Sequence, residues 1–142
     1  MAEAAPQVPI APDLFTWPAD LPQLIASRCT SCGEVAFPKL PSCPACTGES
    51  TEEILLSRRG RLWTWTIQHF PPPHPYLDDG KEFEPFGVGY VELPEGVRVE
   101  SRLSVNDPAA LEIGMEMELA IERFATGDDG SDRMIFVFRP VD

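Results

Sequence analysis

The sequence places all four of its cysteines in two Cys-x-x-Cys pairs with ten residues between the pairs: Cys29, Cys32, Cys43 and Cys46. This spacing is typical of a zinc ribbon, because each pair turns tightly enough to present both sulfurs to one ion. We expect Gly33 and Gly48 to supply the unusual backbone dihedrals with which the chain leaves each turn. Four thiolates leave zinc no open coordination position, so the predicted site is structural.

Three other uses of these cysteines compete with zinc. Two disulfides would suit a secreted chain, but residues 1–12 lack the basic start and apolar stretch of a signal peptide, so we expect a cytoplasmic protein. A thioredoxin-like redox pair belongs on a βαβ unit, which the sequence does not indicate. An iron site of the rubredoxin type uses similar turns, and the sequence does not distinguish it from zinc.

Composition restricts the partners of the chain. Its 142 residues, 43% of them hydrophobic, are enough for one globular domain, or for one domain with a small appendage. The formal net charge of −12 repels the phosphates of nucleic acids and anionic lipids. No stretch approaches the ~18 apolar residues of a membrane-spanning helix. We therefore expect neither nucleic acid nor a membrane as a partner.

The predicted fold class is mainly β, in three parts: an extended arm at 1–17, a short helix plus zinc ribbon at 18–57, and an OB-fold barrel at 58–142. Helical spacing of apolar residues predicts the helix over 20–28. Alternation of apolar and polar residues predicts five strands near 60–69, 86–93, 97–105, 115–122 and 133–138. Five short strands separated by turns favour a small closed barrel.

Two further groups of residues are candidates for binding. Large apolar and proline residues of the arm, and of the stiff segment after the first barrel strand, are expected to contact a partner: Phe15, Trp17, Phe70, Pro72, Pro73 and Tyr76. Packing of that segment on its own barrel explains it equally well. Arg58, Arg59 and Arg61 form the densest basic cluster, which either meets the phosphates of a nucleotide-like cofactor or lines a solvated strand end.

The sequence offers no catalytic set of its own. It contains no Gly-x-Ser-x-Gly elbow, His-Glu-x-x-His motif or Walker loop. Its two histidines are His69 and His74, and a lone histidine at a strand end is more often structural than catalytic. Cysteines held by zinc cannot also serve as nucleophiles. Any catalysis is therefore expected to take place with another subunit.

Six segments carry a resemblance to a known family: 28–33, 43–46, 59–66, 87–96, 113–115 and 136–140. In this order they resemble the acyl-CoA-associated OB-fold family with an N-terminal rubredoxin-like zinc ribbon. The resemblance runs from about residue 13 to the C-terminus, and the cysteine pattern is its most specific part. Thr47 departs from the family pattern because it separates Cys46 from the following glycine, which leaves the ligands intact.

Members of that family accompany thiolase-like enzymes, including thiolases and the aldolases that cleave acyl-CoA side chains of sterols and aromatic compounds. The resemblance implies a non-catalytic accessory subunit with structural zinc, which binds a thiolase-like enzyme in a heterotetramer and supports its acyl-CoA site. Acyl-CoA is then the substrate of the complex, and sterol side-chain degradation is the favoured pathway. A stand-alone acyl-CoA-binding protein and a single-stranded nucleic-acid-binding module are the alternatives.

Overall fold

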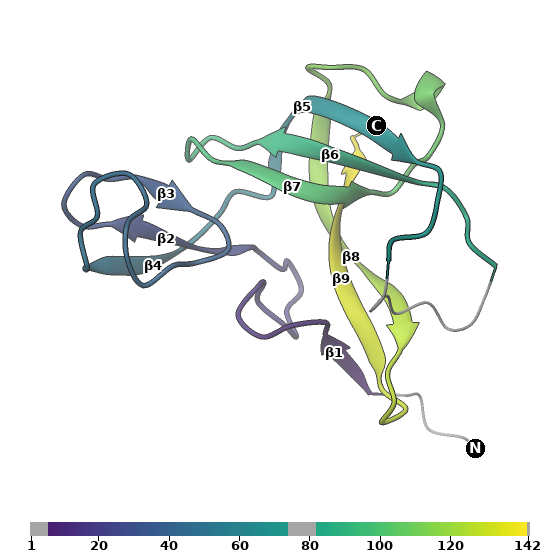
Figure 1. Cartoon of the computed structure of the whole chain (residues 1–142), viewed down its shortest axis with the longest axis horizontal. Coiled ribbons are helices and arrows are strands. Elements are labelled where there is room, and N and C mark those ends of the chain that lie inside the picture. The colour runs from purple at the N-terminus through teal and green to yellow at the C-terminus, as the bar shows by residue number, and fades with distance from the viewer. Residues whose placement is uncertain (1–5, 74–81, 142) are drawn as a thin grey trace.

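The computed structural model describes residues 6–73 and 82–141, which form a small and a large β-sheet (Figure 1). The elements are, in chain order, β1 (Gln7–Pro9), β2 (Ile25–Cys29), β3 (Val35–Ala36), β4 (Thr51–Leu55), β5 (Arg59–Gln68), β6 (Phe86–Glu92), β7 (Arg98–Leu103), the 3-10 turn η1 (Pro108–Ala110), β8 (Glu116–Thr126) and β9 (Asp132–Pro140). β2, β3 and β4 make the small sheet, and the other strands make the large one. Within the described residues, no helix is long and apolar enough to cross a membrane.

Five strands of the large sheet close into a barrel. Hydrogen-bonded neighbours follow the order β9-β7-β6-β5-β8, and β8 pairs again with β9, so the ring has no free edge. The β7–β9 pair is parallel, whereas the other pairs of the ring are antiparallel. This arrangement confirms the mainly β fold and the five-stranded OB-fold barrel predicted from the alternating sequence.

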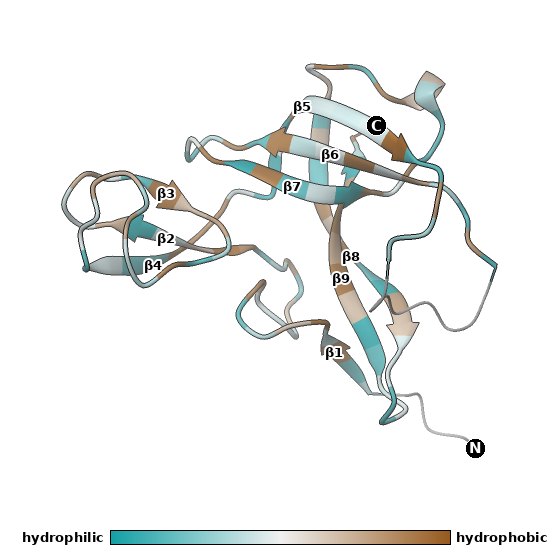
Figure 2. Cartoon of the chain, in the orientation of Figure 1, coloured by the Kyte–Doolittle hydropathy of each residue, from teal (hydrophilic) through white to brown (hydrophobic). Residues whose placement is uncertain are grey.

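Alternation along the strands produces the barrel core. On β8, Met117 and Leu119 are fully buried, while Glu118 between them points to the outside. Hydrophobic and hydrophilic residues accordingly alternate along the barrel strands in Figure 2. The largest fully buried side chains come from the barrel and from the segments around the small sheet: Phe138, Leu24, Leu56, Leu62, Met117 and Leu119.

The arm and the small sheet pack onto the barrel through buried side chains. β1 pairs in parallel with β9, and Phe15 forms an isolated β-bridge with Leu24 just before β2. Phe15, Leu24 and Leu56 belong to the same hydrophobic cluster as the barrel core. The small sheet is therefore held to the barrel by shared apolar contacts as well as by the covalent chain.

The helix expected over 20–28 is wrong, because this segment contributes β2. Leu24 and Ala26 are fully buried while Ile25 is only partly buried, which is the period of a strand. β2 is the central strand of the small sheet and pairs with both β3 and β4, so its backbone groups find hydrogen bonds on both sides. Leu21, near the start of the expected helix, is 69% exposed.

Candidate metal centre

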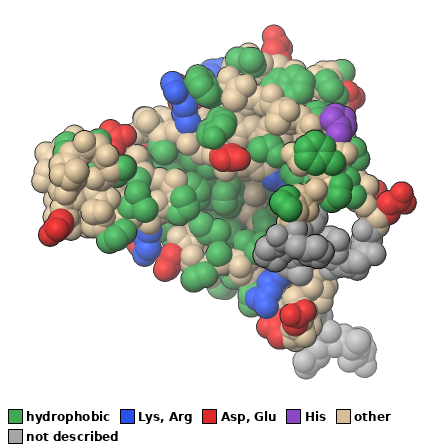
Figure 3. Space-filling view, in the orientation of Figure 1, with side chains coloured by type: hydrophobic (Ala, Val, Ile, Leu, Met, Phe, Trp, Pro, Cys, Tyr) green, Lys and Arg blue, Asp and Glu red, His purple; other side chains and the backbone are tan. Residues whose placement is uncertain are grey.

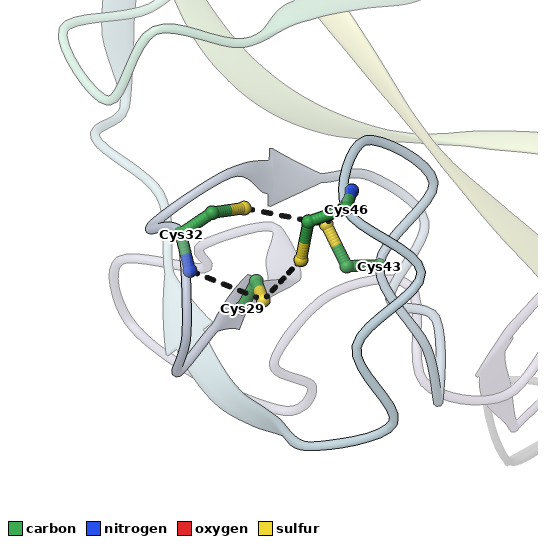
Figure 4. Close-up of side chains that lie close together, drawn as sticks. All are labelled: Cys29, Cys32, Cys43 and Cys46. Atoms are coloured by element: carbon green, nitrogen blue, oxygen red, sulfur yellow. Dashed lines mark hydrogen bonds between the residues drawn. The ribbon is translucent and has the colours of Figure 1, made fainter.

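Two tight turns of the small sheet hold the four cysteines (Figure 4). Cys29 is the last residue of β2, and the turn after it carries Cys32. The second turn, with Cys43 and Cys46, lies between β3 and β4. In each turn the carbonyl of the first cysteine accepts a hydrogen bond from the amide four residues later, with an N···O distance of 3.0 Å in both cases. The two turns are therefore built alike.

Backbone amides point at the sulfur of the first cysteine in each turn. The amides two and three positions after Cys29 lie 3.4 and 3.5 Å from its Sγ. The corresponding amides after Cys43 lie 3.3 and 3.4 Å from its Sγ. An N–H group that donates to sulfur favours the thiolate over the thiol, and the thiolate is the form that binds a metal.

The four sulfurs fit one tetrahedral ion. They all lie within 4.8 Å of one another, and the distances from Cys29 Sγ to Cys46 Sγ and from Cys32 Sγ to Cys43 Sγ are both 3.5 Å. A tetrahedron with Zn–S bonds of about 2.3 Å has sulfurs about 3.8 Å apart, so little adjustment is needed. The cysteines identified in the sequence thus form a closed thiolate site that supports structural zinc.

The sulfurs also influence one another's ionisation. Backbone amides, that of Cys32 first, lower the pKa of Cys29 to about 6. The Glu34 amide favours the Cys32 thiolate, but the sulfurs of the second pair raise the pKa of Cys32 to about 12. Four adjacent thiolates are therefore unfavourable on their own, and a divalent cation that displaces the thiol protons removes the repulsion.

The chain leaves the two turns in different ways. Gly33 has a φ of +81°, as expected for a glycine in this place. In the second turn the positive φ of +64° belongs to Thr47, so the expectation that Gly48 supplies it is wrong. A Cβ on Gly48 would lie 3.3 Å from Cys46 Sγ, and the glycine is therefore explained by limited space beside the sulfur.

The three arginines of the predicted cofactor cluster are all engaged by the protein itself. Arg58 donates hydrogen bonds to the carbonyl oxygens of Pro22 and Leu119. Arg59 forms ion pairs with two glutamates of β8, at N···O distances of 2.9 and 3.4 Å. Arg61 donates to a backbone carbonyl at 3.1 Å. Each arginine thus has a partner within the chain, and a phosphate-binding role for the cluster stays a prediction.

The two aromatic residues of the arm pack against their own chain. Phe15 is 4% exposed and lies in the core, so its expected role as an exposed docking group is wrong. Trp17 is partly buried and meets Phe15 edge to face, with 6.3 Å between the ring centroids. Its indole Nε1 donates to the Gln7 carbonyl oxygen at 3.1 Å. An arm that looks isolated in the sequence is thus part of the folded unit.

The proline-rich segment after β5 keeps one large aromatic group exposed. Phe70 is 68% exposed, Pro72 is partly buried and Pro73 is exposed. Tyr76 and His74 lie outside the described residues. A partner-binding role for this segment stays a prediction.

An aromatic pair that the sequence analysis did not select lies on the outside of the barrel. Trp63 and Tyr90 are 47% and 39% exposed, and their rings meet edge to face with 6.1 Å between centroids. Tyr90 alternates with the fully buried Val91 along β6. That alternation is the sequence signal that places Tyr90 on the outside of the barrel.

Comparison with known proteins matches both parts of the fold. Residues 16–52 match the rubredoxin-like zinc ribbon domain of ChsH2, and residues 53–122 match the C-terminal OB-fold domain of ChsH2. The boundary between the two matches falls within β4, where the small sheet leads into the barrel. The zinc-ribbon match therefore covers most of the small sheet, and the OB-fold match covers the barrel from β5 into β8, while β9 lies beyond it.

Individual relatives match nearly the whole chain. It is 33% identical over 132 residues to the benzoylsuccinyl-CoA thiolase subunit BbsA of Thauera aromatica. The aligned residues cover 92% of this chain and 86% of that subunit. It is 35% identical over 130 residues to a DUF35 domain-containing scaffold protein of Methanothermobacter thermautotrophicus, covering 88% and 93% of the two chains. Among solved structures it resembles a chain of the Ltp2-ChsH2(DUF35) aldolase, with a TM-score of 0.63, 27% identity and coverage of 83% and 84%. The chain therefore belongs to the ChsH2 family, in which a rubredoxin-like zinc ribbon precedes a C-terminal OB-fold domain.

Proposed function

We propose that this protein is a non-catalytic subunit that binds a thiolase-like enzyme and relies on that enzyme for the chemistry. The observation that carries the proposal is the near full-length similarity to a thiolase subunit and to a chain of an aldolase. Within residues 6–73 and 82–141, the cluster of side chains suited to a metal is the closed four-cysteine site, which leaves no position for a substrate. Such a subunit contributes binding surface rather than reacting groups.

The same relatives support a proposal for the substrate class. The Thauera aromatica subunit belongs to a thiolase named for a CoA thioester, benzoylsuccinyl-CoA. We extend that class to the complex formed by this chain, so that the complex acts on an acyl-CoA whose site the chain supports. Two narrower proposals rest on the family resemblance alone. They are a role in sterol side-chain degradation and a heterotetramer with two copies of this chain on a thiolase-like dimer.

Reconstitution tests this function. Each thiolase-family protein of the source organism is co-expressed with the tagged chain, and the products are separated by size-exclusion chromatography. The proposal predicts that one of them co-elutes with the chain and turns over an acyl-CoA faster in its presence. A chain that elutes alone in every co-expression, or that leaves the partner's activity unchanged when added back, would contradict the proposal.

A further inference from the structure

The outer surface of β6 and β7 differs from the rest of the barrel exterior. It carries aromatic, apolar and arginine side chains from three strands, which we call the β6–β7 face: Trp63, Phe86, Val88, Tyr90, Arg98 and Arg102. The outside of β8 is instead acidic, with Glu116 and Glu118 held in ion pairs. Figure 3 shows hydrophobic side chains gathered on the viewed side of the molecule, between the small sheet and the barrel.

Trp63 lies on the outside of the barrel, at an irregularity of β5. The register between β5 and β6 shifts between Leu62 and Thr64, so that Trp63 has no residue paired opposite it, as in a β-bulge. Its ring meets Tyr90 instead, and both rings remain more than a third exposed. Exposed aromatic groups that pack on one another are typical of a binding surface.

Both arginines of the face are held over aromatic rings. The guanidinium carbon of Arg98 lies 4.1 Å from the centre of the Trp63 ring, and that of Arg102 lies 3.8 Å from the centre of the Phe86 ring. These cation–π contacts restrain the two side chains, so they lose little rotamer freedom when a partner binds. Tryptophan, tyrosine and arginine are also the residues that most often carry binding energy at protein interfaces.

The charges of the face indicate the chemistry of its partner. Arg98 is neutralised by Glu92, with 2.9 Å between Nε and the carboxylate oxygen. Arg102 is partly buried, and no carboxylate of the described chain lies within ion-pair distance of it. In a chain of net charge −12, such an arginine is a favourable position for a carboxylate that belongs to another molecule.

A groove of about 450 Å³ lies beside Arg102. Phe86, Val88 and Arg102 of the face contribute to its lining, together with Phe37 and Phe136 from neighbouring segments. The Phe37 and Phe136 rings meet edge to face with 5.5 Å between centroids. This part of the lining is therefore already packed before a partner binds. The groove can accept an apolar side chain next to a carboxylate that pairs with the arginine.

We propose that the β6–β7 face is the surface on which the thiolase-like subunit docks, with an apolar side chain in the groove and a carboxylate opposite Arg102. This inference rests on the proposed function and names the surface that performs it. The corresponding strands of other OB-fold barrels bind single-stranded nucleic acids. Here Glu92 and Glu100 lie on the same surface, Glu100 in the lining of the groove, and the net charge is −12. A nucleic-acid strand would bring many phosphates against these charges, whereas a docking protein brings one carboxylate to Arg102.

The experiment measures, by calorimetry, the dissociation constant between the zinc-loaded chain and the thiolase-family subunit that co-elutes with it. Trp63→Ala and Arg102→Glu are each expected to weaken binding at least ~tenfold. Arg102→Gln is expected to weaken it less than Arg102→Glu, because only the reversed charge repels the partner's carboxylate. Leu21→Glu is the matched control, since it places the same charge at a residue that is 69% exposed outside the face. Zinc content and the melting temperature verify that each variant is folded.

The outcomes separate this inference from the proposed function. If the wild-type chain binds and the folded face variants bind as tightly as Leu21→Glu, the assignment of the face is overturned and the proposed function stands. If the wild-type chain binds no thiolase-family protein, the proposed function fails and the inference fails with it. Self-association that the face variants abolish, or binding of an oligothymidine, would assign the face to a second copy or to nucleic acid and overturn the proposal.

Discussion

Thr47 is a β-branched residue held at a φ of +64° inside the second cysteine turn. This conformation costs a residue other than glycine roughly 1–2 kcal/mol. Glycine removes that cost but loses ~0.5–1 kcal/mol through the larger entropy of its unfolded chain. Thr47→Gly is therefore expected to raise the free energy of unfolding by about 0.5–1 kcal/mol. Chemical denaturation of the zinc-loaded protein measures this change, and a lower free energy of unfolding in the variant would show that the turn does not strain Thr47.

Glu118 links three strands of the barrel through its charge. Its carboxylate accepts hydrogen bonds from Arg139 of β9 at 3.0 Å and from Arg59 of β5 at 2.9 Å. These contacts, that of Arg139 first, hold the pKa of Glu118 below its ordinary value of 4.5. A lowered pKa stabilises the fold above the unfolded-state value, and the stabilisation disappears as the pH falls below 4.5 through the folded-state value.

Glu118→Gln is accordingly expected to lower the free energy of unfolding at about pH 7 by at most ~1 kcal/mol. The free energy of unfolding of this variant should also decrease less than that of the wild type between about pH 5 and about pH 3. Glu122→Gln is the control, because Glu122 lies on the same side of β8 without an ion pair in the described part of the chain. Urea denaturation across this pH range compares the two. Equal acid sensitivity of both variants would mean that Glu118 does not link the strands energetically.

We expect the small sheet to depend on its metal for stability. β3 has two residues, and β2 and β4 have five each, which is too little to hold a sheet without further support. Cys29→Ser and Cys43→Ser each remove one ligand and are expected to release zinc and unfold the ribbon, at a cost of several kcal/mol. The melting temperature of the whole chain should also fall, because Leu24 of this region belongs to the shared core.

Metal analysis and thermal melting test this dependence, with Ser42→Ala beside the second turn as a matched control. The control is expected to keep one zinc ion per chain and a wild-type melting curve. A normal melting profile together with full partner binding in either cysteine variant would show that zinc is not structural in this protein.

Features that depend on neighbouring residues could be predicted from the sequence. Two Cys-x-x-Cys pairs are enough to predict the metal cluster, since each turn brings its own two sulfurs together within four residues. Alternation along 115–122 likewise predicts a half-buried strand, and the structure places that segment mostly in β8. The spacing of neighbouring residues is therefore enough to predict both the metal site and the barrel strands.

Features that depend on distant segments could not be predicted in this way. Residues 25–29 form a strand because 35–36 and 51–55 pair with them, and this pairing outweighs the helical spacing in the same segment. Phe15 is buried by contacts that only the folded chain supplies. The two carbonyl oxygens that accept hydrogen bonds from Arg58 lie 36 and 61 positions away in the sequence. A local sequence motif therefore could not predict the structural role of Arg58.

The arm, the ribbon and the barrel share one hydrophobic cluster, so the chain has a single continuous core despite its two family domains. A shared core fixes the groove beside Arg102, whose lining includes Phe37 from the ribbon region and Phe136 from β9. Loss of the metal is therefore expected to disturb the proposed docking surface as well as the ribbon. Partner binding and zinc occupancy should fall together in the cysteine variants.

Native mass spectrometry of the reconstituted assembly provides the sharpest test of an accessory, zinc-bearing subunit. We expect a mass that contains this chain and a thiolase-family subunit in equal numbers, two copies of each, with one zinc ion for every copy of this chain. Purified chain that remains alone in the presence of every thiolase-family candidate, or that turns over an acyl-CoA with no other protein present, would contradict the proposal.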